Sequence, residues 1–124
     1  MSESLLQQAF FEWVFFEQAR DWRYQLIFSY PIGGKREIAT AKKMKKEGAK
    51  KGVFDVLCLV PSRGKSGLAI EFKVGKNQLT LEQKQFRELL LAVGWEAMEF
   101  RSLETAITYV RDWIGASGLP GIVG

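Results

Sequence analysis

Residues 52–59 read Gly-Val-Phe-Asp-Val-Leu-Cys-Leu, and residues 68–73 read Leu-Ala-Ile-Glu-Phe-Lys. Each stretch is an apolar run of strand length, and a turn-rich segment with proline and glycine separates the two. This pattern predicts a β-hairpin. Charged residues interrupt the two runs only at Asp55, Glu71 and Lys73. Both faces of the predicted strands are therefore apolar, and we expect other elements to cover both.

The sequence on either side of this hairpin predicts further helices and strands. Ser2, Thr80 and Ser102 are suitable N-caps, and Gly48 and Gly94 are suitable helix ends. The expected helices span residues 3–22, 37–47, 81–93 and 103–114, and the expected strands span residues 25–30, 53–60, 68–74 and 95–100. This order predicts an α/β sandwich with a mixed central sheet of about four strands flanked by helices. We expect one domain over residues 1–115 and a flexible C-terminal tail over residues 116–124.

Composition narrows the classes of function. With 124 residues, the chain has the size of one domain, and it contains no histidine. Ser-His-Asp triads, Cys-His triads and histidine-ligated zinc are therefore excluded. Cys58 is the single cysteine, so we expect a buried thiol in a reducing, cytoplasmic compartment. No apolar run approaches the roughly 18 residues of a membrane span, and the N-terminus has no signal-peptide pattern.

The positive charge of the chain is concentrated in one segment. Residues 35–51 hold eight basic and two acidic residues, a charge of +6, whereas the whole chain carries +4. A local basic cluster indicates a polyanionic partner, although a Lys-rich helix is also an ordinary solvated face. We expect DNA phosphate contacts from Arg36, Lys42, Lys43, Lys45, Lys46 and Lys51.

The charged residues of the hairpin are candidates for a metal site. Glu71 and Lys73 share one face of their strand, because side chains two residues apart point the same way. Asp55 joins them if the hairpin pairs odd positions with odd positions. One oxygen each from Asp55 and Glu71, with the carbonyl of Phe72, would then suit Mg²⁺ or Mn²⁺. Such a site can hold a cation and a water beside a phosphodiester.

Three further side chains have possible roles in this chemistry. Lys73 can orient a water or stabilise developing negative charge, and Gln83 can fix that lysine or water. Glu3, in the predicted first helix, can bind the metal directly or through water. Each also has a structural interpretation: an Asp55–Lys73 salt bridge, a capping-box residue at Gln83, and a helix-start acid at Glu3.

The predicted first helix carries apolar residues around most of its circumference. It carries Phe11, Trp13, Phe15 and Phe16 in addition to aliphatic residues. Such a helix is either sandwiched in the core or supplies a subunit interface. Both interpretations remain open from the sequence.

Five stretches of the chain together form a more specific pattern. They are Glu3 with Gln7, Tyr30-Pro31-Ile32-Gly33-Gly34-Lys35-Arg36, Gly48 to Asp55, Glu71-Phe72-Lys73, and Leu79-Thr80-Leu81-Glu82-Gln83. In this order they resemble the motifs of the VRR-NUC domain, a branch of the PD-(D/E)xK nuclease superfamily. The resemblance runs from Glu3 to about Trp113. The chain departs from the family pattern at Phe54, where the superfamily name has proline, and at Ile32, where asparagine is usual.

The resemblance implies a restriction-endonuclease-like fold and a Mg²⁺- or Mn²⁺-dependent DNA endonuclease. It assigns catalytic roles to Asp55, Glu71, Lys73 and Gln83. Short stand-alone members of this kind resemble phage or prophage proteins and are similar to homodimeric resolvases of four-way (Holliday) junctions. A flap- or single-strand-directed nuclease is the alternative within enzymes. A non-catalytic nucleic-acid-binding module, or a small interaction protein with a structural Asp55–Lys73 pair, is the alternative outside them.

Overall fold

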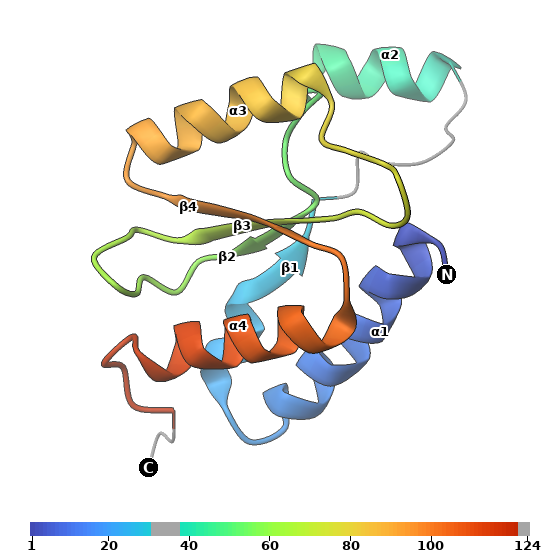
Figure 1. Ribbon diagram of the computed structural model, residues 1–124. Coiled ribbons are helices and arrows are strands. Elements are labelled where there is room, and N and C mark those ends of the chain that lie inside the picture. Colours follow the sequence, from blue (N-terminus) through green and yellow to red (C-terminus); the bar gives the residue numbers. More distant parts are fainter. Residues whose placement is uncertain (31–37, 122–124) are drawn as a thin grey trace.

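A computed structural model describes residues 1–30 and 38–121 of the chain (Figure 1). Its elements follow one another as α1 (Glu3–Gln18), the 3₁₀ helix η1 (Trp22–Leu26), β1 (Ile27–Ser29), α2 (Ile38–Lys46), β2 (Val56–Cys58), β3 (Leu68–Phe72), α3 (Leu81–Ala92), β4 (Glu96–Phe100) and α4 (Leu103–Gly115). The predicted α/β architecture is confirmed. The predicted loop motif from Pro31 to Arg36 lies outside the described residues, as do residues 122–124.

The four strands form one mixed sheet in the order β1-β2-β3-β4. The pairs β1–β2 and β2–β3 are antiparallel, and β3–β4 is parallel. The predicted hairpin of β2 and β3 is confirmed. The predicted strand over residues 53–60 is too long, because the Asp55 N–H donates to the Glu71 carboxylate at 3.1 Å instead of continuing the ladder.

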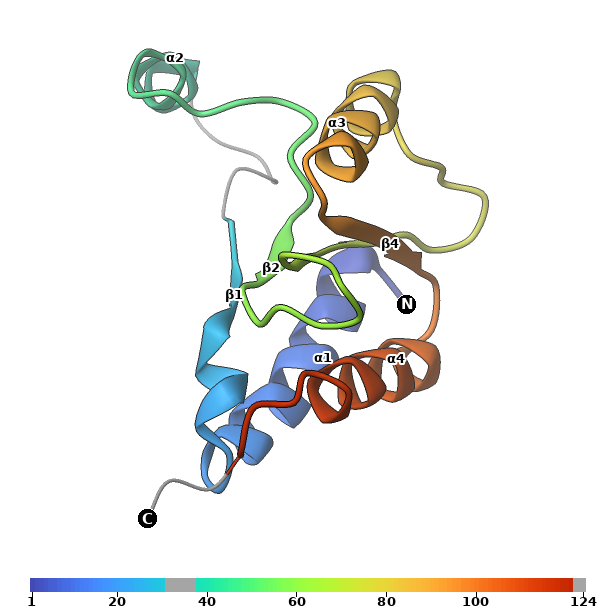
Figure 2. The ribbon, with the colours of Figure 1, turned by 90° about the vertical axis from the view of Figure 1, so that its left-hand side faces the viewer.

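Helices cover both faces of the sheet, as the apolar strands predict. Figures 1 and 2 show α1 and α4 on one face and α3 on the other. Large side chains such as Phe10, Phe72 and Trp113 fill the core on the α1–α4 face. Ala69 and Ala97 lie under α3, in a smaller cluster. The apolar core is therefore large on the α1–α4 face of the sheet and small on the α3 face.

The first helix is shorter than predicted and is divided between core and surface. It ends at Gln18 rather than at residue 22, because the Asp21 side chain accepts a hydrogen bond from the Arg23 N–H and starts η1. The η1 turn also shortens the strand predicted over residues 25–30. Helix α1 buries Leu6, Phe10, Val14 and Glu17, but Leu5, Phe15 and Phe16 are exposed.

Two segments differ in how they join this body. Helix α2 projects from it (Figure 2), and its lysines are exposed. Residues 116–121 of the predicted flexible tail lie against η1, where Trp22 donates to the Pro120 carbonyl and Arg23 to the Leu119 carbonyl. No helix within the described ranges is long and apolar enough to cross a membrane.

Candidate active site

The register of the hairpin determines which charged residues meet. Val56 pairs with Ile70, so one further step along the ladder brings Asp55 opposite Glu71. Odd positions therefore pair with odd positions, the arrangement that the metal-site hypothesis requires. On β3, Glu71 follows Ala69 at a spacing of two, which places it on the α3 face of the sheet.

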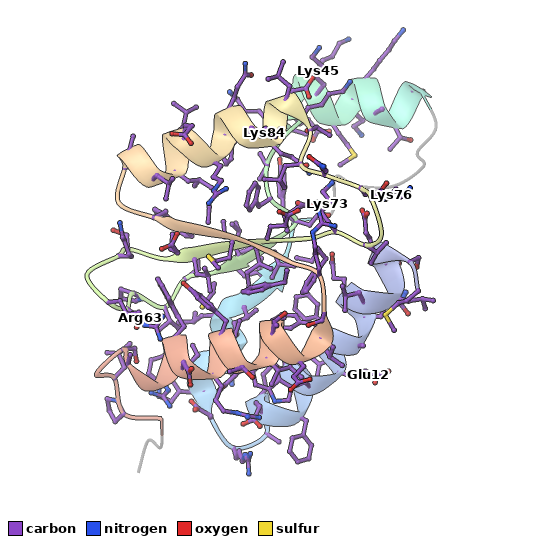
Figure 3. All side chains as sticks on the ribbon, viewed as in Figure 1. Glu12, Lys45, Arg63, Lys73, Lys76 and Lys84 are labelled. Atoms are coloured by element: carbon purple, nitrogen blue, oxygen red, sulfur yellow. The ribbon has the colours of Figure 1, made fainter. Side chains whose placement is uncertain are left out.

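Lys73 lies buried beside this acid pair. The residue is only 7% exposed, and its Nζ is 3.9 Å from a carboxylate oxygen of Glu71. The backbone N–H of Lys73 donates to the Phe100 carbonyl, which fixes the end of β3 against β4. In Figure 3, Lys73 lies inside the molecule, whereas Lys45, Lys76 and Lys84 lie on its surface. Among the described ion pairs, Lys73 contacts Glu71, and the alternative Asp55–Lys73 salt bridge is not formed.

The surroundings of Asp55 and Glu71 disfavour the ionised form of both carboxyl groups. Burial, together with the nearby Asp55, raises the pKa of Glu71 to about 7. Burial also raises the pKa of Asp55, and the Lys73 charge offsets part of this rise. The buried Glu71 and the half-buried Asp55, with one lysine nearby, lack positive charge. This deficit and the set of hard oxygen donors fit a divalent cation.

The acids and the lysine open into a cavity of about 530 Å³, which we term the acid–lysine cavity. Its walls come from the first turns of α1, the end of β1, the start of β2, the end of β3 and the start of α3. The lining residues are Glu3, Ser4, Gln7, Gln8, Phe11, Ser29, Tyr30, Asp55, Glu71, Phe72, Lys73 and Gln83. The structure thus brings together every residue that the sequence assigned to catalysis or to the metal. Another hollow, of about 550 Å³, is lined by residues of α3 and of the end of β4 and contains none of them.

Glu3 lies at the edge of this group rather than within it. It lines the cavity, and its charge contributes to the raised pKa values of Asp55 and Glu71. Its carboxylate accepts a hydrogen bond from the Asn77 side chain at 2.8 Å. Within residues 1–30 and 38–121, no three acidic, histidine or cysteine side chains are close enough to share one metal ion. Asp55 and Glu71 are therefore the direct carboxylate ligands that this arrangement offers.

Gln83 has the structural role of a capping-box residue and also faces the cavity. Its side-chain oxygen accepts from the Thr80 N–H at 2.9 Å, and its own N–H donates to the Thr80 hydroxyl at 3.1 Å. The cap fixes the side chain and leaves the amide –NH₂ group to donate into the cavity. The two interpretations of Gln83 are compatible.

The predicted DNA contacts lie apart from the cavity. Helix α2 and the segment after it expose Lys42, Lys43, Lys45, Lys46 and Lys51. Arg36 lies outside the described residues. Gly52 connects this segment to the cavity, because a Cβ on it would come within 2.7 Å of the Glu82 backbone in the first turn of α3. The basic segment therefore approaches the start of α3 closely at this point.

Sequence reasoning missed several residues that line the cavity or hold its lining residues in place. Asn77 holds Glu3, and the Arg101 guanidinium in turn donates to the Asn77 carbonyl. Nothing local in the sequence indicates these pairings. The wall residues Gln8 and Phe11 do carry a signal, because Gln8 follows Ser4 by four residues and Phe11 follows Gln8 by three, which are helical spacings. Tyr30, part of the predicted loop motif, lines the cavity and donates its backbone N–H to the Asp55 carbonyl.

Comparisons with known proteins agree with this architecture. No model of a known protein family matches the chain, and no curated protein sequence matches it. A solved structure described as a VRR_NUC domain protein matches over the whole chain and over 97% of its own length, with 21% sequence identity and a TM-score of 0.76. At this level of identity the likeness establishes a shared fold. The chain has the fold of that VRR_NUC domain protein, as the sequence motifs predict.

Proposed function

We propose that this chain is a divalent-metal-dependent nuclease that hydrolyses DNA phosphodiesters in the acid–lysine cavity. The observation that carries the proposal is the meeting of Asp55, Glu71 and Lys73 in one cavity of a nuclease-like fold. Isolated acid and lysine pairs are common on strands. A buried carboxylate that faces a half-buried one, with a buried lysine beside them, is uncommon, because burial disfavours their charges.

The residues of the cavity have separable roles in this proposal. Asp55 and Glu71 hold Mg²⁺ or Mn²⁺, with the Phe72 carbonyl as a further oxygen donor. When bound, the cation supplies an acidified water and positive charge at the scissile phosphate. Lys73 donates to the attacking water or to a phosphate oxygen. Gln83 holds Lys73 or that water in position by hydrogen bonding. Glu3 acts on the cation through water, because Asn77 holds its carboxylate.

The basic segment binds the DNA backbone. The lysines of α2 are exposed and carry their charge on a helix that projects from the body. Such a surface contacts phosphates without reading base sequence. We extend this role to Lys51 and Arg36, which flank the helix in sequence.

The finer part of the proposal concerns the substrate and the assembly. We propose a homodimer that resolves four-way DNA junctions, with a flap- or single-strand-directed nuclease as the alternative. Leu5 and Phe16, 54% and 67% exposed, supply an apolar surface on the outer side of α1 for a second copy. A two-fold dimer would present two acid–lysine cavities to a symmetric junction. Phe11 and Trp13 pack partly against the core and are less available for such an interface.

A cleavage assay tests the proposed function. Matched four-way junction, flap, duplex and single-stranded DNA are incubated with Mg²⁺ or Mn²⁺ and with the wild type, Asp55→Asn and Asp112→Asn. Asp112 is a matched control, because it is exposed on α4 and lies outside both the acid–lysine cavity and the outer side of α1. We expect Asp55→Asn to lower the cleavage rate by about 10²- to 10³-fold and Asp112→Asn to leave it unchanged.

The pattern of products separates the finer alternatives. Symmetric nicking of the junction supports a dimeric resolvase, and preferential cutting of flaps or single strands supports the alternative. Sedimentation that shows a monomer at micromolar concentration contradicts the dimer. Absence of metal-dependent cutting on all four substrates contradicts the nuclease itself.

A further inference from the structure

The acid–lysine cavity has two chemically different walls. One wall carries the charged side chains of Asp55, Glu71 and Lys73 from the sheet. The opposite wall comes from α1 beyond Glu3 and is neutral. There the Gln8 amide donates to the Ser4 hydroxyl at 3.1 Å, and the ring of Phe11 completes the surface. A neutral wall with its amides already engaged does not attract a phosphate, but it suits an uncharged, flat group.

The neutral wall continues out of the cavity along one face of α1. Ser4, Gln8, Phe11 and Phe15 follow one another at spacings of four, three and four, so they form one row on the helix. The rings of Phe11 and Phe15 have their centroids 5.7 Å apart. Phe10 packs edge-on against Phe11 and holds it in place. Phe15 is 61% exposed, so the row ends in an accessible aromatic ring.

The neighbouring Phe16 is not part of this row. It is similarly exposed, but one residue along an α-helix turns the side chain by about 100°. The Arg20 guanidinium also lies over the Phe16 ring, 5.4 Å from its centroid. Phe15 and Phe16 therefore face different surroundings, although they are adjacent in sequence and identical in chemistry.

We propose that Phe11 and Phe15 form a stacking platform for an unpaired DNA base next to the phosphate received by the charged wall. This inference rests on the proposed nuclease function and adds the structure of the substrate around the cut. Aromatic rings bind bases through their faces, which are accessible only where the bases are not stacked in a duplex. A substrate with unpaired bases at the cut, such as a flap, a single strand or the open centre of a junction, gains this contact. A continuous duplex does not.

Binding without metal tests the platform separately from cleavage. The affinity of a 12-nucleotide single strand and of a matched duplex is measured in EDTA by fluorescence anisotropy, for the wild type, Phe15→Ala and Phe16→Ala. We expect Phe15→Ala to weaken single-strand binding by roughly 5- to 100-fold and to leave duplex binding within about twofold. Phe16→Ala should leave the ratio of single-strand to duplex affinity unchanged, because Phe16 belongs to the surface proposed for a second copy and lies outside the row.

Two further variants distinguish stacking from general apolar contact. Phe15→Trp should retain single-strand affinity, and Phe15→Leu should lose it as Phe15→Ala does. A strand with 2-aminopurine near its centre should lose fluorescence on binding to the wild type and to Phe15→Trp, because stacking quenches this base. Wild-type affinity in Phe15→Leu would overturn the proposal.

Other outcomes would also overturn it. Equal losses of single-strand preference in Phe15→Ala and Phe16→Ala, or equal losses of Phe15→Ala affinity for single strand and duplex, exclude selective base stacking at Phe15. Dissociation of a dimer by Phe15→Ala alone would assign the row to an interface between copies instead. Failure of the proposed function appears differently, as wild-type DNA binding with no cleavage in the presence of metal.

Discussion

Lys73 and Lys45 have the same side chain, but the two regions that carry them are built in opposite ways. Lys73 is 7% exposed, beside two acids, at the end of a strand held on both sides. Lys45 is exposed on α2, a helix that projects from the body (Figure 2). A buried group acts through fixed position and low dielectric, whereas an exposed group acts through charge that salt screens. The acid–lysine cavity should therefore be sensitive to single changes, and α2 should be tolerant of them.

The largest expected difference is between Lys73→Ala and Lys45→Ala. Loss of the Lys73 donor should lower the single-turnover cleavage rate by about 10²- to 10³-fold, because the charge is placed where the phosphate reacts. Loss of Lys45 should leave that rate unchanged at saturating protein and weaken DNA binding only a few-fold. Thermal unfolding of both variants controls for misfolding. Equal loss of rate in the two variants would refute the contrast.

The acid pair predicts a large effect of pH on the metal-free protein. The pKa of Glu71 is raised from 4.5 to about 7, so the folded protein retains a proton that the unfolded chain releases. At pH values between these two pKa values, ionisation of Glu71 therefore favours the unfolded chain. From roughly pH 5 to pH 8, the free energy of unfolding should fall by on the order of 3 kcal/mol. Urea denaturation in EDTA across this range measures the change.

Glu71→Gln provides the control for this effect. The neutral amide cannot ionise, so the fall in stability with pH should largely disappear in the variant. Addition of Mg²⁺ to the wild type should also reduce the fall, because a bound cation stabilises the ionised carboxylate. An unchanged pH dependence in Glu71→Gln would show that other groups cause it.

The contrast between the regions also explains what could be predicted from the sequence. The caps at Ser2, Thr80 and Ser102 are local signals, and the helices begin after them as predicted. The meeting of Asp55 and Glu71 follows from strand periodicity once the hairpin has the right register. These features depend on residues near one another in sequence.

Features that depend on distant residues could not be predicted in the same way. Asn77 contacts Glu3 across the fold, which changes the role available to that glutamate. The hydrogen bond from the Asp55 N–H to Glu71 shortens β2, and no local pattern indicates it. On α1, the apolar pattern identifies candidate contacts, but only packing decides that Phe10 is buried and Phe15 exposed.

Gly52 joins the two regions, and its substitution should have an intermediate effect. It has a φ of +86°, and a Cβ would come within 2.7 Å of the Glu82 backbone. Gly52→Ala should lower the free energy of unfolding by about 1–3 kcal/mol. Gly48→Ala is the matched control, because its φ is +101° and a Cβ would meet nothing within 4 Å. Any loss in Gly52→Ala beyond that in Gly48→Ala measures the close packing on α3, and equal losses would exclude such packing.

The smallest effects of single substitutions are expected on α2, where they should add. Each lysine that contacts a phosphate releases a counterion on binding, so each neutralised contact should reduce the salt slope of duplex binding by about 0.9. A series that converts Lys42, Lys45 and Lys46 to glutamine one after another should lower the slope in nearly equal steps and leave the cleavage rate at saturation unchanged. Arg63→Gln, on a part of the molecule distant from α2 (Figure 3), serves as the control. If the slope stays constant across the series, α2 is a solvated face, and the DNA must reach the acid–lysine cavity along another surface. A steep loss at the first substitution would instead indicate that one lysine occupies a fixed site, and the contrast between a positioned cavity and a distributed basic helix would fail.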